Sequence, residues 1–232
     1  MPGHIILAGG SEFQAGMDRA DRRAITLAGG PDAPIRIIPA AAAPDRNHER
    51  AGGNAVRWFR SLGARDVAAV GLINRRSADD PAVVAELRAA RLIYMLGGFP
   101  RHLNEALLGS AAWDACREAH AAGAVLGGSS AGAMVLCEML FDPQANTPIP
   151  GLNLVPGIVI LPHHNTFGAG WASRLAPKLP DLALLGIDER TALIDDGTAG
   201  GWTVYGPGAA TLYQGESVER SAERAVVHWA RS

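Results

Sequence analysis

A serine flanked by glycines is the residue whose setting most directly suggests chemistry. The segment 128–132, GSSAG, fits the pattern G-x-S-x-G when it is centred on Ser130, whereas centring it on Ser129 would require glycine at position 131. In this pattern a sharp strand-to-helix turn projects the serine, and small neighbours avoid collisions. The N-terminus of the following helix offers free N–H groups to an oxyanion. Ser130 is therefore a candidate nucleophile; the alternative is a strand end followed by a helix-capping serine.

A serine hydroxyl becomes an effective nucleophile only beside a base, and the base needs a partner that orients it. His163 and His164 follow an apolar run that Pro162 ends, so the pair is expected at the end of a predicted strand. Strand ends are where functional residues gather in open α/β sheets. The alternative is a pair of surface histidines in a loop. The other histidines are interpreted as solvated or structural, and they are His4, His48, His102, His120 and His228.

Two carboxylate positions could orient a histidine base. Asp142 lies between Ser130 and the histidine pair, whereas Asp188 and Glu189 follow the pair in the segment LLGIDERTALI. That segment places carboxylates between apolar runs, directly before a predicted strand. An α/β-hydrolase has the chain order Ser, Asp, His. Because the better-placed acid comes after the histidines, the sequence argues against the α/β-hydrolase fold despite the matching turn.

Short apolar runs alternate with longer amphipathic segments, and these elements must position the candidate residues. The predicted strands cover residues 4–7, 35–38, 66–71, 92–96 and 124–126. The predicted helices cover residues 46–62, 80–90, 103–122 and 131–140. Short runs rich in Val, Ile and Leu are typical of parallel strands buried on both faces. The sequence therefore predicts an α/β fold with a doubly wound, mostly parallel sheet sandwiched by helices.

The character of the sequence changes after about Pro143. Prolines at positions 148, 150, 156 and 162 mark a loop-rich segment. Three short apolar runs follow, and they cover residues 191–194, 202–205 and 211–213. Asp-Gly, Gly-Gly and Pro-Gly pairs separate these runs and favour turns, which predicts a small β-hairpin or meander at the sheet edge. No linker or repeat interrupts the chain, so we expect residues 1–232 to form a single domain.

The composition is that of an ordinary globular protein. Of the 232 residues, 48% are hydrophobic and 19% charged, and the net charge of −2 argues against nucleic-acid or anionic-membrane binding. No signal peptide or membrane-spanning run is evident. Cys116 and Cys137 form no C-x-x-C pair and H-E-x-x-H is absent, so we expect a reduced, cytoplasmic protein with no metal site or cofactor. The segment LAGGSEF lacks the G-x-G-x-x-G of dinucleotide sites.

Six segments, in this order along most of the chain, form a more specific pattern than the turn alone: LAGGSEF, IIPAAAA, IYMLGGFPRHLNEAL, GGSSAGA, LPHH and GIDERTAL. Together they resemble the peptidase E / cyanophycinase family of serine hydrolases, which has a class I glutamine-amidotransferase-like fold. The resemblance implies that Ser130 is the nucleophile, His163 the base and Glu189 the acid that orients it. It also implies an oxyanion hole formed by the backbone N–H groups of Gly98 and Ala131. Family members cleave small peptides after aspartate or release β-Asp-Arg dipeptides from cyanophycin.

The segment after the histidine pair departs from the family pattern. His164 stands where many relatives carry Phe or Tyr, so both histidines compete for the role of base, and the preceding proline favours His163. The arginine-rich segment with which aspartyl dipeptidases of the family bind a substrate carboxylate reads NTFGAGWASRL here. Candidate substrate-binding residues are Arg174, His164 and Asn165. Further candidates for substrate recognition or for a pocket wall are Arg75, Arg76, Phe167, Trp171 and Trp202.

The sequence thus predicts a serine-type peptidase that hydrolyses short peptides, aspartyl dipeptidase-like or cyanophycinase-like, through a Ser-His-Glu triad and an acyl-enzyme. Its partner is a small peptide substrate. One alternative is an amidase or a glutamine-amidotransferase-like hydrolase, although amidotransferases of this fold use cysteine where this chain has Ser130. Another is a non-catalytic binding protein on the same fold. The substrate side chains and the oligomeric state stay open, with a homodimer among the alternatives.

Overall fold

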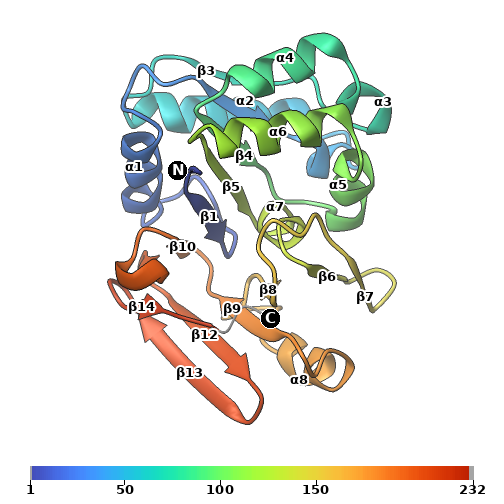
Figure 1. Ribbon diagram of the computed structural model, residues 1–232, viewed down its shortest axis with the longest axis vertical. Helices are drawn as coiled ribbons and strands as arrows, with labels where there is room; N and C mark the ends of the chain where they lie inside the picture. Colours follow the sequence, from blue (N-terminus) through green and yellow to red (C-terminus); the bar gives the residue numbers. More distant parts are fainter. Residues whose placement is uncertain (1, 230–232) are drawn as a thin grey trace.

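The core of the protein is an α/β sheet, and the computed structural model describes residues 2–229 of the chain. Within these residues the larger sheet has eight strands, in the order β14-β11-β10-β1-β5-β4-β2-β3. Figure 1 shows β1, β4 and β5 at the centre of this sheet. The parallel strands are β1 (Ile5–Ala8), β2 (Ile35–Ile38), β3 (Val67–Ala69), β4 (Leu92–Met95) and β5 (Val125–Ser129). The antiparallel strands at one edge are β10 (Ala192–Ile194), β11 (Trp202–Tyr205) and β14 (Val226–Val227). The predicted mostly parallel α/β sheet is confirmed.

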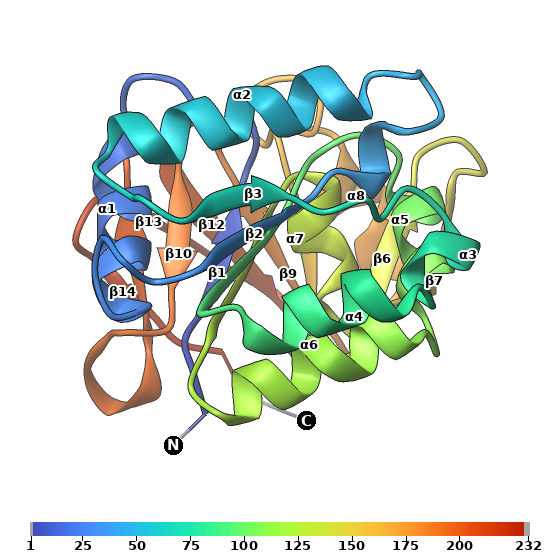
Figure 2. The ribbon, with the colours of Figure 1, turned by 90° about the horizontal axis from the view of Figure 1, so that it is seen from above.

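Helices cover both faces of the parallel part of this sheet (Figure 2). One face carries α1 (Asp18–Leu27) and α2 (His48–Ser61), and the other carries α4 (Pro81–Ala89), α5 (Pro100–Leu107) and α6 (Ala111–Ala121). Strand β1 shows how the sequence produces these layers. Ile6 packs in the core beneath α1 and α2, whereas Leu7 packs in the core beneath α4, α5 and α6. Successive strand residues point to opposite faces, so a strand covered on both sides is apolar throughout.

A smaller sheet, in the order β13-β12-β9-β8, follows in the second half of the chain. Strands β8 (Ile158–Leu161) and β9 (Ala183–Ile187) are parallel, and the hairpin of β12 (Ala209–Gln214) and β13 (Ser217–Ala222) extends the sheet. Residues 188–191 connect β9 to β10 of the larger sheet. The short elements are α3 (Arg75–Ala78), α7 (Ala131–Val135), α8 (Trp171–Leu175), the hairpin β6 (Met139–Asp142) and β7 (Thr147–Pro150), and 3₁₀ turns at Ala40–Ala42, Ala176–Lys178 and Thr198–Gly200.

The helix predicted over residues 131–140 is wrong in its second half. Helix α7 ends at Val135, and β6 begins four residues later. The carbonyl group of Val135 accepts a hydrogen bond from the backbone N–H of Leu152 at 2.8 Å. A longer helix would need this carbonyl for its own hydrogen bonds. A distant part of the chain therefore ends the helix, which local periodicity cannot reveal.

The helix predicted over residues 103–122 is instead two helices, α5 and α6. Gly109 has a φ of 69°, a left-handed conformation that suits glycine and ends the first helix. Ser110 then caps the second helix, because its hydroxyl oxygen accepts the backbone N–H of Trp113 at 3.0 Å. Helix α1 is missing from the sequence-based prediction. Its buried residues are two alanines, Asp21 and Ile25, which give a weak apolar signal.

The predicted C-terminal meander is divided between the two sheets. Residues 191–194 and 202–205 correspond to β10 and β11, which extend the edge of the larger sheet as predicted. Residues 211–213 lie instead within β12 of the smaller sheet. Among residues 2–229, the helices are all too short or too polar to cross a membrane.

Asp21 of α1 is a buried carboxyl group whose environment predicts a pH effect on stability. It is 0% exposed, and it accepts a hydrogen bond from the indole N–H of Trp58 at 2.7 Å. Burial raises the pKa of Asp21 to about 7. Because the folded-state pKa lies above the unfolded value, the stability that Asp21 contributes is lost as the pH rises from about 4 to about 7. We expect Asp21→Asn to raise the melting temperature more at pH 8 than at pH 5.

This comparison is checked by thermal unfolding of both proteins across that pH range. One kcal/mol of stability corresponds to a shift of about 2–4 °C in the melting temperature of a chain of this size. At pH 8 the melting temperature of Asp21→Asn should therefore exceed that of the wild type by several degrees. Asp114→Asn is the matched control, because that carboxylate is 56% exposed on α6. An identical pH profile for Asp21→Asn and the wild type would contradict the prediction.

Candidate active site

Ser130 occupies a strained turn between β5 and α7. Its backbone angles are φ 50° and ψ −113°, a region that non-glycine residues rarely adopt. Both flanking glycines are required by close packing. A Cβ on Gly128 would lie 2.2 Å from the carbonyl carbon of Gly132, and a Cβ on Gly132 would lie 2.2 Å from the carbonyl oxygen of Met95. The G-x-S-x-G pattern thus marks a turn that holds the Ser130 hydroxyl out from the sheet.

His163 lies two residues after the end of β8, and the loop after β1 holds it in place. Its backbone N–H donates to the carbonyl oxygen of Gly9 at 2.7 Å, and its φ is 52°. The imidazole lies against Gly10, where an added Cβ would come within 2.2 Å of the ring. Phe167 stacks on the same imidazole with ring centroids 4.4 Å apart. The ring therefore has one defined orientation, although the Phe167 side chain itself is 65% exposed.

Ser130, His163 and Glu189 form a connected chain of hydrogen bonds. His163 Nε2 lies 3.1 Å from Ser130 Oγ, and His163 Nδ1 lies 2.8 Å from Glu189 Oε1. A carboxylate can only accept, so Nδ1 carries the proton and Nε2 is left to accept the serine O–H. The hydrogen bond to His163 holds the pKa of Glu189 below its ordinary value. Glu189 therefore remains ionised near neutral pH and can stabilise an imidazolium.

Glu189 is held by residues of a neighbouring loop. Its backbone N–H donates to Asn165 Oδ1 at 2.9 Å, and its carboxylate accepts from Thr166 Oγ1 at 3.2 Å. Asn165, a sequence candidate for substrate binding, thus uses its side-chain oxygen to fix the backbone of Glu189.

His164 lies outside this chain of hydrogen bonds. It is 8% exposed, and its Nε2 lies 2.9 Å from the hydroxyl of Tyr213 on β12. Its Nδ1 is 3.7 Å from the buried Asp188 carboxylate. Burial lowers the pKa of His164, so this ring is neutral at neutral pH. Of the two histidines, His163 is the one whose ring contacts Ser130.

The backbone N–H groups between β4 and α5 leave one donor free beside Ser130. Those of Leu96, Gly97 and Phe99 donate to protein acceptors at 3.1, 3.3 and 2.8 Å. The N–H of Gly98 has no acceptor within residues 2–229, and neither has that of Ala131 at the start of α7. Two such donors beside a serine suit a negatively charged oxygen.

Glycine is required at position 98. Its φ is 140°, and an added Cβ would lie 2.3 Å from the carbonyl oxygen of Ala41. The neighbouring Gly97 is close to the nucleophile turn, because a Cβ added there would lie 3.3 Å from Ser130 Cβ. The loop of residues 96–99 therefore packs directly against the Ser130 turn.

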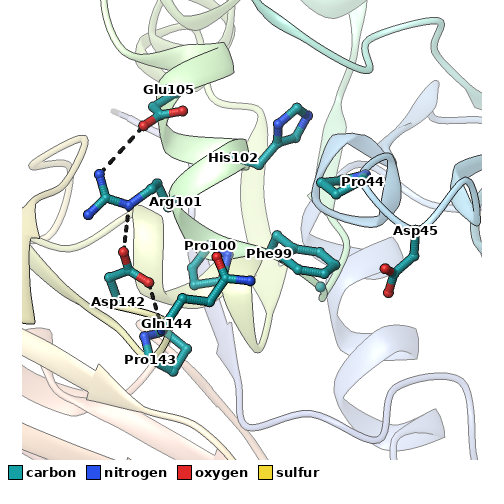
Figure 3. A pocket seen from close by; sticks show the side chains of 11 residues that line it. Pro44, Asp45, Phe99, Pro100, Arg101, His102, Glu105, Asp142, Pro143 and Gln144 are labelled. Carbon is teal, nitrogen blue, oxygen red and sulfur yellow. Dashed lines mark hydrogen bonds and ion pairs between the residues drawn. The ribbon is translucent and has the colours of Figure 1, made fainter. Parts of the chain in front are cut away.

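Two clefts meet at this loop. The first, which we call the Arg101 cleft, has a volume of about 510 Å³ and is shown in Figure 3. Arg101 lies between Glu105 and Asp142 in this view, and its Nε donates to Asp142 Oδ2 at 2.5 Å. The second, the Gln14 cleft, has a volume of about 330 Å³. Both clefts are lined by Asp45, Gly98 and Phe99.

The structure places the remaining sequence candidates away from Ser130. Asp142 is buried and paired with Arg101, so it does not orient either histidine. Arg174 is exposed on α8 and lines neither the Arg101 cleft nor the Gln14 cleft. Arg75 donates to the carbonyl oxygens of Leu108 and Gly109, which ties α3 to the turn after α5. The other positions are Arg76, exposed on α3, Trp171, packed between Phe141 and Phe167, and Trp202, packed against Trp229.

The two cysteines are both buried. Cys137 is 0% exposed, and burial raises the pKa of its thiol well above the ordinary value. Burial likewise raises the pKa of Cys116 to about 12. A thiol in such surroundings is inert as a nucleophile. Within the described part of the chain, His, Cys, Asp and Glu side chains form no cluster that could hold a metal ion.

The loop after β1 contributes a carboxylate that is not among the candidates predicted from the sequence. Glu12 accepts hydrogen bonds from the hydroxyl of Ser129 at 2.8 Å and from the N–H of Gly97 at 3.3 Å. A signal for this role exists in the sequence, because LAGGSEF places a carboxylate at the carboxyl end of a parallel strand. The stacking of Phe167 on His163 cannot be predicted from the sequence in the same way, because a single aromatic residue in a loop can have many different roles.

The comparisons with known proteins all indicate a peptidase family. The model of peptidase family S51 matches residues 5–200. A cyanophycinase of Nostoc sp. is 27% identical over 220 residues, which cover 90% of this chain and 72% of that protein. The crystal structure of a peptidase from an acI-B1 Actinobacterium superposes with a TM-score of 0.87 at 26% identity, covering 99% of this chain and 98% of that chain.

A more distant solved structure shares the fold. It is that of a candidate peptidase E from Listeria monocytogenes EGD-e, with a TM-score of 0.61 at 17% identity. The alignment covers 95% of this chain and 98% of that chain. The architecture is thus common to chains whose sequences have diverged widely.

Proposed function

The chain belongs to peptidase family S51 and is a serine-type peptidase, and from this premise we propose that it hydrolyses short peptides through Ser130, His163 and Glu189. The observation that carries the proposal is the 3.1 Å approach of His163 Nε2 to Ser130 Oγ. That distance is within hydrogen-bond reach, as a nucleophile and its general base require. We propose likewise that residues 1–232 form a single catalytic domain.

In the proposed first step, Ser130 Oγ attacks the carbonyl carbon of the scissile peptide bond, and its proton passes to His163 Nε2. The imidazolium formed is stabilised by the Glu189 carboxylate 2.8 Å from Nδ1. The carbonyl oxygen becomes an oxyanion, which accepts hydrogen bonds from the N–H groups of Gly98 and Ala131. Both N–H groups are free of acceptors among residues 2–229, which supports this role.

In the proposed second step, the C–N bond breaks and His163 returns its proton to the leaving amine. The acyl group then remains on Ser130 Oγ as an ester. A water molecule loses a proton to His163 and attacks this ester, which releases the new carboxylic acid and restores the serine. The protons balance, because His163 accepts one proton and donates one proton in each half-reaction.

The two clefts support a peptide substrate that extends from the proposed oxyanion site. The Arg101 cleft and the Gln14 cleft both reach Gly98, where the proposed oxyanion forms. Clefts of about 510 and 330 Å³ accommodate a few residues rather than a folded protein. The substrate class proposed is therefore short peptides.

A fluorophosphonate probe tests the nucleophile without knowledge of the substrate. We expect the wild-type protein to be labelled once, on the peptide that contains Ser130, because the probe needs an activated serine and an oxyanion hole. The labelled protein should lose its hydrolysis of a library of short peptides, assayed with and without N-terminal aspartate. The readouts are mass spectrometry of the labelled peptide and residual peptide cleavage.

The alternatives give different results in the same experiment. Iodoacetamide is the control reagent, and it should leave the activity intact because both cysteines are buried. The amidase alternative would be favoured if the protein were not labelled and if it had a glutaminase activity that iodoacetamide abolished. Absence of labelling and of any hydrolysis would favour a non-catalytic binding protein.

A further inference from the structure

The loop of residues 9–13 contacts several segments that form the proposed active site. Its carbonyl oxygens at Gly9 and Gly10 accept the backbone N–H groups of His163 and Arg190 at 2.7 and 2.9 Å. The same loop carries positive φ angles of 112°, 53° and 62° at Gly10, Ser11 and Phe13. Backbone strain of this kind persists where surrounding contacts enforce it, and it is concentrated at functional sites.

Glu12 is the one carboxylate of this loop, and it joins two separate chain segments. Its Oε2 accepts the hydroxyl of Ser129, the buried residue that precedes the proposed nucleophile, at 2.8 Å. Its Oε1 accepts the N–H of Gly97, the residue that precedes the proposed oxyanion donor, at 3.3 Å. One side chain thus connects the nucleophile turn to the loop of residues 96–99.

The partners of Glu12 are both uncharged. Among residues 2–229, no Lys, Arg or His side chain forms an ion pair with Glu12. A half-buried carboxylate without a counter-ion is a costly way to stabilise a fold, because desolvation of the charge is not offset by Coulomb attraction. Its position between two elements of the site therefore points to a role in the geometry of the reaction rather than in stability.

We propose that Glu12 is a positioning residue that fixes the Gly98 N–H relative to Ser130, an inference that rests on the proposed function. Gly98 has no side chain and a φ of 140°, so its own preferences do not set the direction of its N–H. Glu12 anchors the preceding amide from one side, and the Phe99 N–H bond to Ala41 at 2.8 Å anchors the following one. The direction of the Gly98 N–H is then determined by its two anchored neighbours.

The experiment compares Glu12→Ala and Glu12→Gln with the wild type. We expect Glu12→Ala to lower the rate constant of fluorophosphonate labelling at Ser130, and kcat for a cleaved peptide, by about 10- to 100-fold, because small misplacements of reacting groups have effects of this size. KM should change by no more than a few-fold. Glu12→Gln should recover most of the rate, since its amide oxygen can accept the Gly97 N–H and its NH₂ can donate to Ser129.

Glu138→Ala is the matched control. The Glu138 carboxylate also accepts a glycine N–H, that of Gly157 at 2.8 Å, but it lies away from Ser130. We expect this variant to be labelled at the wild-type rate even if its melting temperature falls. If Glu12→Ala does not fold, Ser129→Ala removes the other partner of the carboxylate and should lower the labelling rate in the same direction.

Three results would overturn the inference. Labelling of Glu12→Ala at the wild-type rate would show that the carboxylate does not position the site. Equal rate losses in Glu12→Ala and Glu138→Ala at equal melting temperatures would show a purely structural role. Failure of the wild type to react at Ser130 would refute the proposed function and this inference with it, whereas the first two results leave the proposed function standing.

Discussion

Replacement of Ser130 by alanine is expected to lower kcat for peptide hydrolysis by about 10⁶-fold, as loss of a serine nucleophile does in a comparable relay. The alanine has no oxygen to attack the carbonyl, and His163 Nε2, 3.1 Å from Ser130 Oγ, loses its proton donor. The measurement is steady-state hydrolysis of a cleaved peptide, with fluorophosphonate labelling as a second readout. The fold should remain, since the side chain is small and half-buried.

The matched control is Ser173→Ala, which removes an exposed hydroxyl on α8 that bonds to Gly170. It should leave kcat unchanged. The backbone of Ser130 makes a further distinction possible, because φ 50° and ψ −113° suit glycine. Ser130→Gly should be inactive yet more stable than the wild type by about 1 kcal/mol, the lower end of the usual range for such strain. Substantial hydrolysis by either Ser130 variant would refute the assignment of the nucleophile.

Replacement of His163 by alanine is expected to abolish hydrolysis almost as completely, whereas replacement of His164 is not. His163 is the ring within reach of both Ser130 and Glu189. Because serine and base act as one unit, the double variant of Ser130 and His163 should be no slower than either single variant. The measurement is kcat of the three variants on the same peptide.

His164→Ala is the control within the same pair. It removes the contact with Tyr213 at 2.9 Å and leaves a cavity beneath β12, so the melting temperature should fall while kcat stays within about tenfold of wild type. The reverse pattern, an active His163→Ala and an inactive His164→Ala, would require the loop after β8 to rearrange and would make His164 the base.

The parallel core of the fold could be predicted because its signal is local. Strands β1 and β4 are uninterrupted apolar runs, and Arg36 is the one polar residue of β2. These three strands lie within one residue of their predicted positions, whereas β5 extends three residues beyond its predicted end. Their carboxyl ends form one edge, so the residues that follow them were expected to meet there. The glycine spacing around Ser130, at the end of β5, identified this serine as a candidate nucleophile.

The remaining features depend on contacts between distant parts of the chain. Helix α7 ends at Val135 because Leu152 takes its carbonyl oxygen. Glu12 forms hydrogen bonds with Gly97 and Ser129, which lie 85 and 117 residues away along the chain. The choice between His163 and His164 likewise depends on which ring faces Ser130 once β8 is in place. Composition and periodicity carry no information about such distances.

The proposed serine and base are mounted on different sheets: Ser130 follows β5 of the larger one and His163 follows β8 of the smaller one. Their hydrogen bond therefore depends on how the two sheets are aligned with each other. A slight slide of one sheet past the other would break the proton path while every strand kept its partners. On the proposed mechanism, a substitution that shifts one sheet relative to the other is therefore expected to lower turnover, even when it lies away from Ser130 and His163.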